Sequence, residues 1–239
     1  WIKSPKFEDV RNVDLNRLRE ALPSSTSVRI EHDVIARATS VCDARDLTPG
    51  SYAFLYVADG LGLAFYDGEK FQIGSRGLAG EIGHIPYPGT TLLEPDRCFC
   101  GQAACMETLL STKGIVRTIN KWKGTEESEL SGALSMLNST EAEAIRDEIQ
   151  RLLSYLMVLV TNLFDPELIM VGGSAIGPWL GYLQNALPDQ VRQKSWMNGP
   201  PEILWFTEQE SNPADGAARV VAPEVRSTVI EKILSSDSD

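Results

Sequence analysis

One histidine and three cysteines in the middle of the chain have the spacing of metal ligands. Cys98, Cys100 and Cys105 fall close together, and His84 precedes them. Three thiolates and one imidazole form the ligand set of a structural zinc site, in which four protein ligands leave no open position for catalysis. In a reducing compartment, clustered cysteines indicate metal binding rather than disulfides. The alternative is a group of buried thiols without a metal.

Two glutamates flank this cluster and could bind a sugar. Glu81 lies three residues before His84, and Glu107 lies two residues after Cys105, so a metal at the centre would hold both carboxylates near each other. Paired carboxylates can accept hydrogen bonds from the neighbouring hydroxyls of a sugar ring. The competing interpretation is two solvated surface acids.

A third acid, Asp33, stands at an expected strand-to-helix junction, where it could be a general base or a helix N-cap. Further along, Asp59-Gly60-Leu61-Gly62 contains the two glycines of a weak phosphate-loop signal. Neither a helix nor a lysine follows to hold a phosphate, so a glycine-containing hairpin is the simpler interpretation.

Strands and helices alternate along the chain around these residues. The predicted elements are a strand at 28–30, a helix at 34–41, an antiparallel meander at 52–57, 63–66 and 70–73, helices at about 104–121 and 140–164, a strand at 168–171, a helix at 179–193, a strand at 203–206 and a helix at 216–234. Thr140 and Glu143 form a predicted capping box at the start of the longest helix. This alternation predicts an α/β fold.

Composition and charge exclude several classes of protein. The 239 residues are 43% hydrophobic, which is enough for one or two buried cores and argues against disorder. The net charge of −11 would repel a phosphate backbone, so these residues are not expected to bind nucleic acid by themselves. Apolar runs are too short for a membrane helix, and Trp1–Val10 lacks a signal-peptide core. We therefore expect a cytoplasmic location without membrane insertion.

Taken together, the motifs resemble those of the ROK family, named for repressors, open reading frames and sugar kinases. They cover nearly the whole chain and comprise Glu31-His32-Asp33, the glycine hairpin, Gly80-Glu81-Ile82-Gly83-His84, the segment 98–107, Asn162-Leu163-Phe164-Asp165-Pro166 and Gly172-Gly173. The resemblance implies an actin-like, ribonuclease-H-like ATPase fold of the α/β class. Residues 1–50 would be a remnant of the N-terminal lobe, and residues 51–239 would form the C-terminal lobe with its zinc loop at 84–105.

The resemblance also implies roles for individual residues. Structural Zn²⁺ would be bound by His84, Cys98, Cys100 and Cys105. A sugar or sugar phosphate would be held by His32, Asp33, Glu81, His84 and Glu107. In the family's kinases, the aspartate that matches Asp33 is the general base that activates the sugar hydroxyl.

Two departures from the kinase pattern favour a regulator. The kinases carry Asn-Asp where this chain has His32-Asp33, and a Gly-Thr-Gly-x-Gly-x-Gly loop where Asp59 here replaces the hydroxyl. A carboxylate at this position would repel the phosphates of ATP, leaving Asp59, Gly60 and Gly62 as the remnant of a phosphate loop. The sequence thus predicts the effector-binding and oligomerisation region of a sugar-responsive ROK transcriptional repressor, without catalytic residues.

Such a repressor would contact DNA through an N-terminal helix-turn-helix that these residues do not include, and would form a homodimer or tetramer. One alternative is an ATP-dependent hexose kinase, with Asp33 as the base and Mg²⁺-ATP near Gly60, Gly62 and Gly172. Another is a repressor controlled by a transport-system protein instead of a sugar.

Overall fold

The computed structural model describes residues 2–3, 11–13, 20–24, 26, 28–87, 89–196 and 201–222. The chain divides into two compact units, residues 1–32 and 33–239. In the first unit, β1 (Ile2–Lys3) pairs with β2 (Arg11–Val13) in antiparallel fashion. The assignment of residues 1–50 and 51–239 to two lobes stays a prediction.

The predicted strand at 28–30 is wrong. These residues have no regular secondary structure and pair with no strand in the described ranges. Val28 and Ile30 are exposed, at 38% and 50%. A strand is stabilised by hydrogen bonds and side-chain contacts with a neighbouring strand, which alternating apolar residues alone do not supply.

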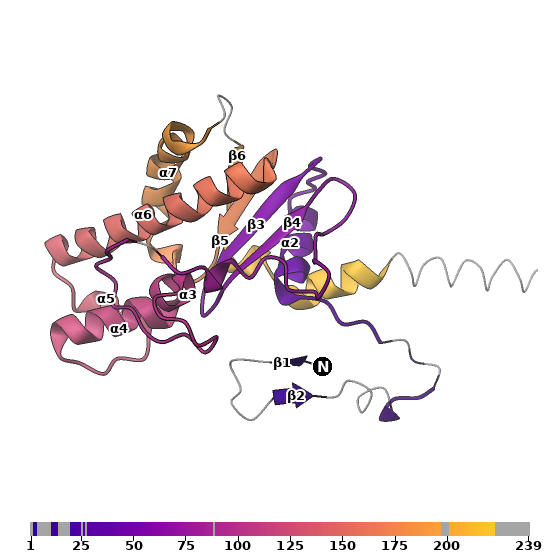
Figure 1. The fold of residues 1–239 in the computed structure, drawn as a ribbon, viewed down its shortest axis with the longest axis horizontal. Coiled ribbons are helices and arrows are strands. Elements are labelled where there is room, and N and C mark those ends of the chain that lie inside the picture. Colours follow the sequence, from indigo (N-terminus) through magenta and orange to yellow (C-terminus); the bar gives the residue numbers. More distant parts are fainter. Residues whose placement is uncertain are drawn as a thin grey trace, which may run out of the picture. The chain divides into compact units, whose positions relative to one another are not determined.

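The second unit is built on a four-stranded mixed sheet in the order β4-β3-β5-β6 (Figure 1). Its strands are β3 (Tyr52–Val57), β4 (Leu61–Tyr66), β5 (Leu168–Gly172) and β6 (Glu202–Phe206). β3 and β4 form an antiparallel hairpin, whereas β3, β5 and β6 run parallel, with Tyr56 beside Gly172 and Gly172 beside Phe206. The carboxyl ends of the three parallel strands therefore meet at one edge, where α/β sheets commonly bind ligands.

Alternate residues of β3 pack into the two cores that cover the faces of this sheet. Tyr52, Phe54 and Tyr56 pack with α2 (Asp33–Ala44). Ala53, Leu55 and Val57 pack into the larger core, which includes residues of α3 (Met106–Leu110), α4 (Thr112–Lys123), α5 (Leu130–Ser135), α6 (Ser139–Phe164) and α7 (Leu180–Lys194). Figure 1 shows α2 and α6 on opposite sides of the sheet. The α/β class is thus confirmed.

Several element boundaries differ from the prediction. The helix expected at about 104–121 is interrupted at Ser111, whose backbone is extended and whose hydroxyl accepts a hydrogen bond from Gly114 N, so that α4 starts anew. The capping box of α6 is formed by Asn138 and Glu141 and not by Thr140 and Glu143. The asparagine side chain bonds the Glu141 amide, so the helix starts earlier than predicted.

The third strand of the expected meander, at 70–73, is also wrong. The segment makes a single bridge, between Tyr66 and Phe71. Ile73 is 49% exposed and its carbonyl accepts a hydrogen bond from Ala79 N, so the chain turns into a loop instead of extending the sheet.

Residues 213–222 form a helix that packs against α2, where a Cβ at Gly216 would lie 1.7 Å from Ala36 O. The rest of the helix predicted at 216–234 lies outside the described residues. Among the helices in the described ranges, none is sufficiently long and apolar to cross a membrane.

Candidate functional site

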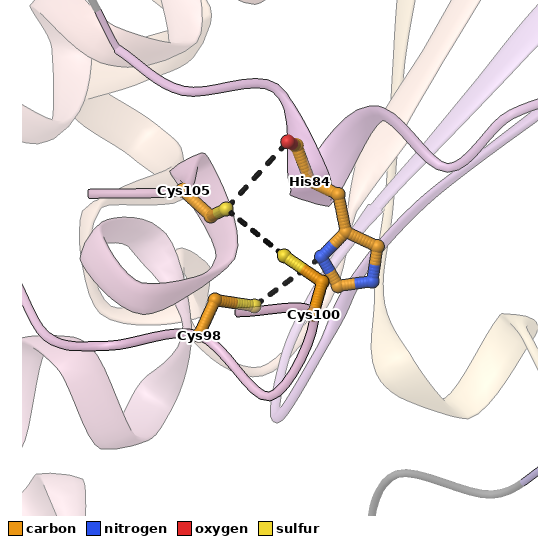
Figure 2. A group of neighbouring side chains, drawn as sticks. All are labelled: His84, Cys98, Cys100 and Cys105. Atoms are coloured by element: carbon orange, nitrogen blue, oxygen red, sulfur yellow. Dashed lines mark hydrogen bonds between the residues drawn. The ribbon is translucent and has the colours of Figure 1, made fainter. Parts of the chain in front are cut away.

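The predicted zinc ligands come together in the structure (Figure 2). The ligand atoms of His84, Cys98, Cys100 and Cys105 all lie within 4.8 Å of one another. Cys98 Sγ is 3.4 Å from His84 Nδ1, and Cys100 Sγ is 3.6 Å from Cys105 Sγ. Zinc–sulfur bonds of about 2.3 Å at tetrahedral angles place two sulfurs about 3.8 Å apart. The four side chains therefore fit a tetrahedral metal ion.

Local backbone structure holds these ligands in place. His84 ends a short 3₁₀ helix, η1 (Ile82–His84), and Cys105 forms an isolated bridge with Pro86 just beyond it. At the tip of the loop, Cys98 N donates to Gln102 O and Gly101 N donates to Cys98 O. These hydrogen bonds curl the chain, so that cysteines distant from His84 in sequence face its imidazole.

The environment of the thiols differs from one cysteine to the next. Burial raises the pKa of Cys105 to about 12 and also raises that of Cys98. The backbone amide of Gln102 lowers the pKa of the exposed Cys100 thiol. Because buried thiolates require a compensating positive charge, a bound Zn²⁺ would supply what Cys98 and Cys105 lack.

The second nitrogen of the His84 ring faces a carboxylate. His84 Nε2 lies 3.7 Å from Glu81 Oε2, while Nδ1 faces the thiols. Glu81 is 51% exposed, so it remains accessible to a ligand from solvent. One ring nitrogen of His84 can thus bind a metal while the other lies beside an exposed carboxylate. In this arrangement a bound metal would fix the orientation of the imidazole next to Glu81.

Glu107 lies against the hairpin between β3 and β4. Its Oε2 accepts a hydrogen bond of 3.2 Å from Leu61 N. A Cβ would lie 3.4 Å from this oxygen at Gly60 and 3.2 Å from it at Gly83. Glycine at these two positions thus leaves room for the carboxylate between the hairpin and the turn that carries His84.

Asp33 reaches the same hairpin through the residue that follows it. It opens α2 and is exposed, and the next residue, Val34, packs so closely that a Cβ at Gly62 would lie 2.6 Å from its Cγ2. The hairpin from Gly60 to Gly62 is therefore in contact with both the helix of Asp33 and the carboxylate of Glu107. His32 belongs to the first unit, and its amide donates to Glu31 Oε1.

The remaining predicted phosphate-loop residue, Asp59, lies exposed in the hairpin turn, where Ala58 N donates to Gly60 O. Gly172 has a packing role of its own, because a Cβ there would lie 2.4 Å from Phe206 O. Gly60, Gly62 and Gly172 thus lie at the carboxyl edge of the sheet. Close packing against neighbouring residues is enough to explain why these positions are glycine, and a bound nucleotide is not needed for that explanation.

Sequence reasoning missed a charged cluster next to Asp33. Arg37, one turn further along α2, lies 4.2 Å over the ring of Tyr56 and donates to Glu208 Oε1 at 3.1 Å. Tyr56 donates to the same oxygen at 2.6 Å. Burial is the main cause that raises the Tyr56 pKa well above its ordinary value, and this hydrogen bond raises it further. Glu208 opens η3 (Glu208–Glu210) after β6. The residues are far apart in sequence, so no local pattern could reveal them.

A second acid of η3, Glu210, pairs with Arg45, the residue that follows α2, and this contact predicts how stability depends on acid. Glu210 accepts from Arg45 at 2.6 Å and from Thr207 at 2.8 Å, which lowers its pKa from 4.5 to about 2. A lowered folded-state pKa contributes stability above pH 4.5 that is lost as the pH falls toward 2. We expect Glu210→Gln to flatten the fall in melting temperature between about pH 5 and 3.

Thermal unfolding followed by circular dichroism measures this difference, with Glu143→Gln, the loss of an exposed acid on α6, as the control. If the Glu210 variant loses stability with acid as steeply as the wild type, the Arg45 contact does not stabilise the helix.

Comparison with known proteins places these features in a family. Residues 2–223 match the ROK family. An N-acetylmannosamine kinase of Haemophilus influenzae is 28% identical over 135 residues, which are 56% of this chain and 43% of that relative. The chain therefore covers less than half the length of that curated relative.

Two solved structures show the same fold. A ROK hexokinase from Thermus thermophilus aligns over 89% of this chain and 70% of its own, with a TM-score of 0.71 and 22% identity. A ROK family transcriptional regulator, described as a homolog of the E. coli MLC protein, aligns over 87% of this chain and 55% of its own, with a TM-score of 0.67 and 22% identity.

These comparisons correct one prediction and confirm two. The expectation of a protein that is not an enzyme is wrong, because the curated relatives that match include N-acetylmannosamine kinases and several similar structures are sugar kinases. The actin-like ATPase fold is confirmed by the structural matches. The family resemblance is confirmed as well, since the match spans most of the sequence: the chain belongs to the ROK family.

Proposed function

We propose that the chain is the sugar-binding part of an ATP-dependent sugar kinase. The observation that carries this proposal is the glycine hairpin, which contacts both the helix opened by Asp33 and the carboxylate of Glu107. Glu107 also approaches Gly83, next to His84. A candidate general base and candidate sugar ligands thus surround one short segment at the end of β3.

In this proposal, the side chains divide into a general base and ligands of the sugar. Asp33 accepts the proton of the sugar hydroxyl that attacks the terminal phosphate of ATP. Glu81, His84 and Glu107 accept or donate hydrogen bonds to the other hydroxyls and so orient the ring. Mg²⁺-ATP is the phosphoryl donor. Phosphoryl transfer depends mainly on positioning and on electrostatic stabilisation, so fixed geometry in these residues is the protein's main contribution.

Zinc would act on structure and not on chemistry. His84, Cys98, Cys100 and Cys105 would hold Zn²⁺ with no open position, which fixes the loop that joins η1, with His84, to α3, with Glu107. The metal would therefore set the position of the sugar ligands without touching the sugar.

We propose hexoses and their N-acylated amino forms as the substrate class. The names of the curated relatives make N-acetylmannosamine the first substrate to test. Carboxylates and an imidazole recognise vicinal hydroxyls in general, so glucose, mannose and N-acetylglucosamine complete the panel.

A second candidate is a sugar-responsive transcriptional regulator of the same family. Asp59 in the hairpin and the similarity to a ROK regulator favour it. In that protein a sugar or sugar phosphate would shift an equilibrium between states that bind DNA and states that do not. Its DNA, its oligomeric state and any transport-system partner stay predictions, as does a cytoplasmic location.

Ligand-dependent unfolding of the full-length protein separates the two candidates. Each sugar and its 6-phosphate is tested with and without Mg²⁺-ATP, because a ligand that binds the folded state raises the melting temperature. A kinase is expected to be stabilised by Mg²⁺-ATP and further stabilised by a sugar. Stabilisation by a sugar phosphate, with no response to Mg²⁺-ATP, would instead favour the regulator.

The charge of Asp59 makes a separate prediction for the kinase. Because a carboxylate near the phosphates opposes their binding, we expect Asp59→Thr to lower the KM for ATP by about tenfold, which corresponds to about 1.4 kcal/mol. Steady-state kinetics with varied ATP measures it. Glu69→Gln, in the exposed turn after β4, removes the same charge elsewhere and serves as the control. An unchanged KM in the Asp59 variant would place this residue away from the nucleotide.

A further inference from the structure

The segment that leads from His84 to Cys98 contacts α6 through an ion pair between a buried glutamate and a half-exposed arginine. Glu148 of α6 is only 5% exposed, although glutamate is among the residues that proteins bury least often. Its partner Arg151 stands one turn further along the helix, with Nε 2.9 Å from Glu148 Oε2 and Nη2 2.5 Å from Oε1. This is a two-pronged pairing, the geometry in which arginine and carboxylate bind most specifically.

Both members of the pair also form hydrogen bonds with residues of the loop. Glu148 Oε1 accepts hydrogen bonds from Thr91 Oγ1 at 2.5 Å and from Leu92 N at 3.1 Å. Arg151 donates to Thr90 O at 2.8 Å and to the hydroxyl of Tyr87, and its guanidinium lies 5.0 Å from the centre of the Tyr87 ring. The pair therefore binds backbone and side-chain atoms of Tyr87 and of residues 90–92.

The same stretch is continuous with the candidate metal centre. Tyr87 N donates to Ala104 O at 3.0 Å, and Met106 N donates to Ile85 O at 3.0 Å. These bonds join the two residues that flank Cys105 to the chain just after His84. A shift of Tyr87 relative to α6 would thus be transmitted to ligands at both ends of the loop.

Stability alone is a poor explanation for this pair. An ion pair that buries a carboxylate contributes little to stability compared with apolar residues of the same size, whereas its geometry admits few alternative arrangements. Burial opposes ionisation of Glu148, but hydrogen bonds from Arg151 and Thr91 hold its pKa below the ordinary value. The carboxylate is therefore charged, and a loop shifted by one residue would leave it paired with Arg151 but without the hydrogen bonds from Thr91 and Leu92.

We infer that Glu148 and Arg151 are positioning residues for the metal loop, holding Tyr87 and residues 90–92 in the one register that brings His84 alongside Cys98, Cys100 and Cys105. The inference rests on the proposed zinc site. Because the pair already orders the loop, less conformational entropy is lost when the metal binds. The pair therefore raises zinc affinity without contacting zinc.

Glu148→Gln tests the inference in the full-length protein. The glutamine keeps the volume and one acceptor oxygen, but it removes the charge that pairs with Arg151. We expect zinc affinity, measured by competition with a chromogenic chelator, to fall about tenfold, the lower end of the loss seen when supporting residues around metal ligands are changed. Amide hydrogen exchange across residues 87–94 should also accelerate.

A matched control comes from the same helix. Arg146 pairs with Asp147 and stacks on Tyr182 of α7, away from the loop contacts, so Arg146→Gln should leave zinc affinity unchanged. If Glu148→Gln does not fold, Thr91→Val removes a single donor to Glu148, and a fall of about threefold in zinc affinity is expected.

The outcomes distinguish this inference from the proposals on which it depends. Wild-type zinc affinity in a folded Glu148→Gln or Thr91→Val protein would overturn it. A wild-type protein that binds no zinc would overturn both the zinc site and the inference. Zinc bound by the wild type and weakened in the variant, without phosphorylation of any sugar, would support the inference and remove only the kinase proposal.

Discussion

Replacing Asp33 with asparagine is expected to lower the rate of ATP-dependent sugar phosphorylation by about 10²–10⁴-fold, the usual contribution of a general base. Asparagine has the same shape and can still contact a hydroxyl, but it cannot accept the proton that the hydroxyl must lose. Since Asp33 is exposed at the start of α2, the substitution should leave the fold intact.

The measurement is kcat with saturating sugar and ATP, together with sugar affinity from calorimetry. We expect kcat to fall far more than affinity, because the base acts mainly in the transition state. Asp46→Asn, just after the same helix, is the control: the residue has a positive φ of 51°, which asparagine tolerates. A kcat within about threefold of the wild type would exclude Asp33 as the base.

Replacing Cys105 with serine should have the second large effect, the loss of bound zinc. Cys105 is fully buried, and its Sγ is 3.6 Å from Cys100 Sγ and 3.5 Å from His84 O, so a hydroxyl there would be a poor metal ligand with little access to water. With three ligands left, we expect zinc affinity to fall at least about a hundredfold and sugar affinity to fall with it.

Zinc content after dialysis, thermal unfolding and sugar calorimetry test this expectation. Cys42→Ser is the matched control, because Cys42 lies on α2 outside the metal cluster. Equal zinc content and equal melting temperature in the Cys105 variant and the wild type would contradict a structural metal at this position.

Short-range patterns in the sequence were sufficient for most of the sheet and for the candidate metal ligands that the structure brings together. The cysteines are close together in the chain, so their spacing alone constrains which atoms can meet. The strands at 52–57 and 168–171 are apolar and β-branched or aromatic over most of their length, and the structure has β3 and β5 there. His84 was grouped with the cysteines as the fourth ligand from its residue type, although it is more distant in sequence.

Tertiary contacts decided what local patterns could not. Ser111 sits within a stretch of helical periodicity, and only the cap formed with Gly114 shows that one helix ends and another begins. Glu148 and Arg151 have ordinary helical spacing, and the residues around them in the sequence do not indicate that Glu148 accepts a hydrogen bond from Thr91. Interactions across long sequence separations depend on how the elements pack, and packing is not encoded in a short window.

The function was predicted less well than the fold, for a related reason. Asp59 was interpreted as a loss of ATP binding because one charge near a phosphate opposes it. That inference weighs a single pair of charges, whereas binding depends on every group around the phosphates. The curated relatives named in this comparison favour a kinase, so the charge of Asp59 alone does not exclude ATP binding.

The most direct test of the central proposal is transfer of the labelled terminal phosphate of ATP to N-acetylmannosamine and the other sugars of the panel by the full-length, zinc-loaded protein. We expect a phosphorylated sugar to accumulate in proportion to enzyme and to disappear with Asp33→Asn. Tight sugar binding with no phosphorylated product for any sugar would contradict the kinase and leave the regulator as the account of this site.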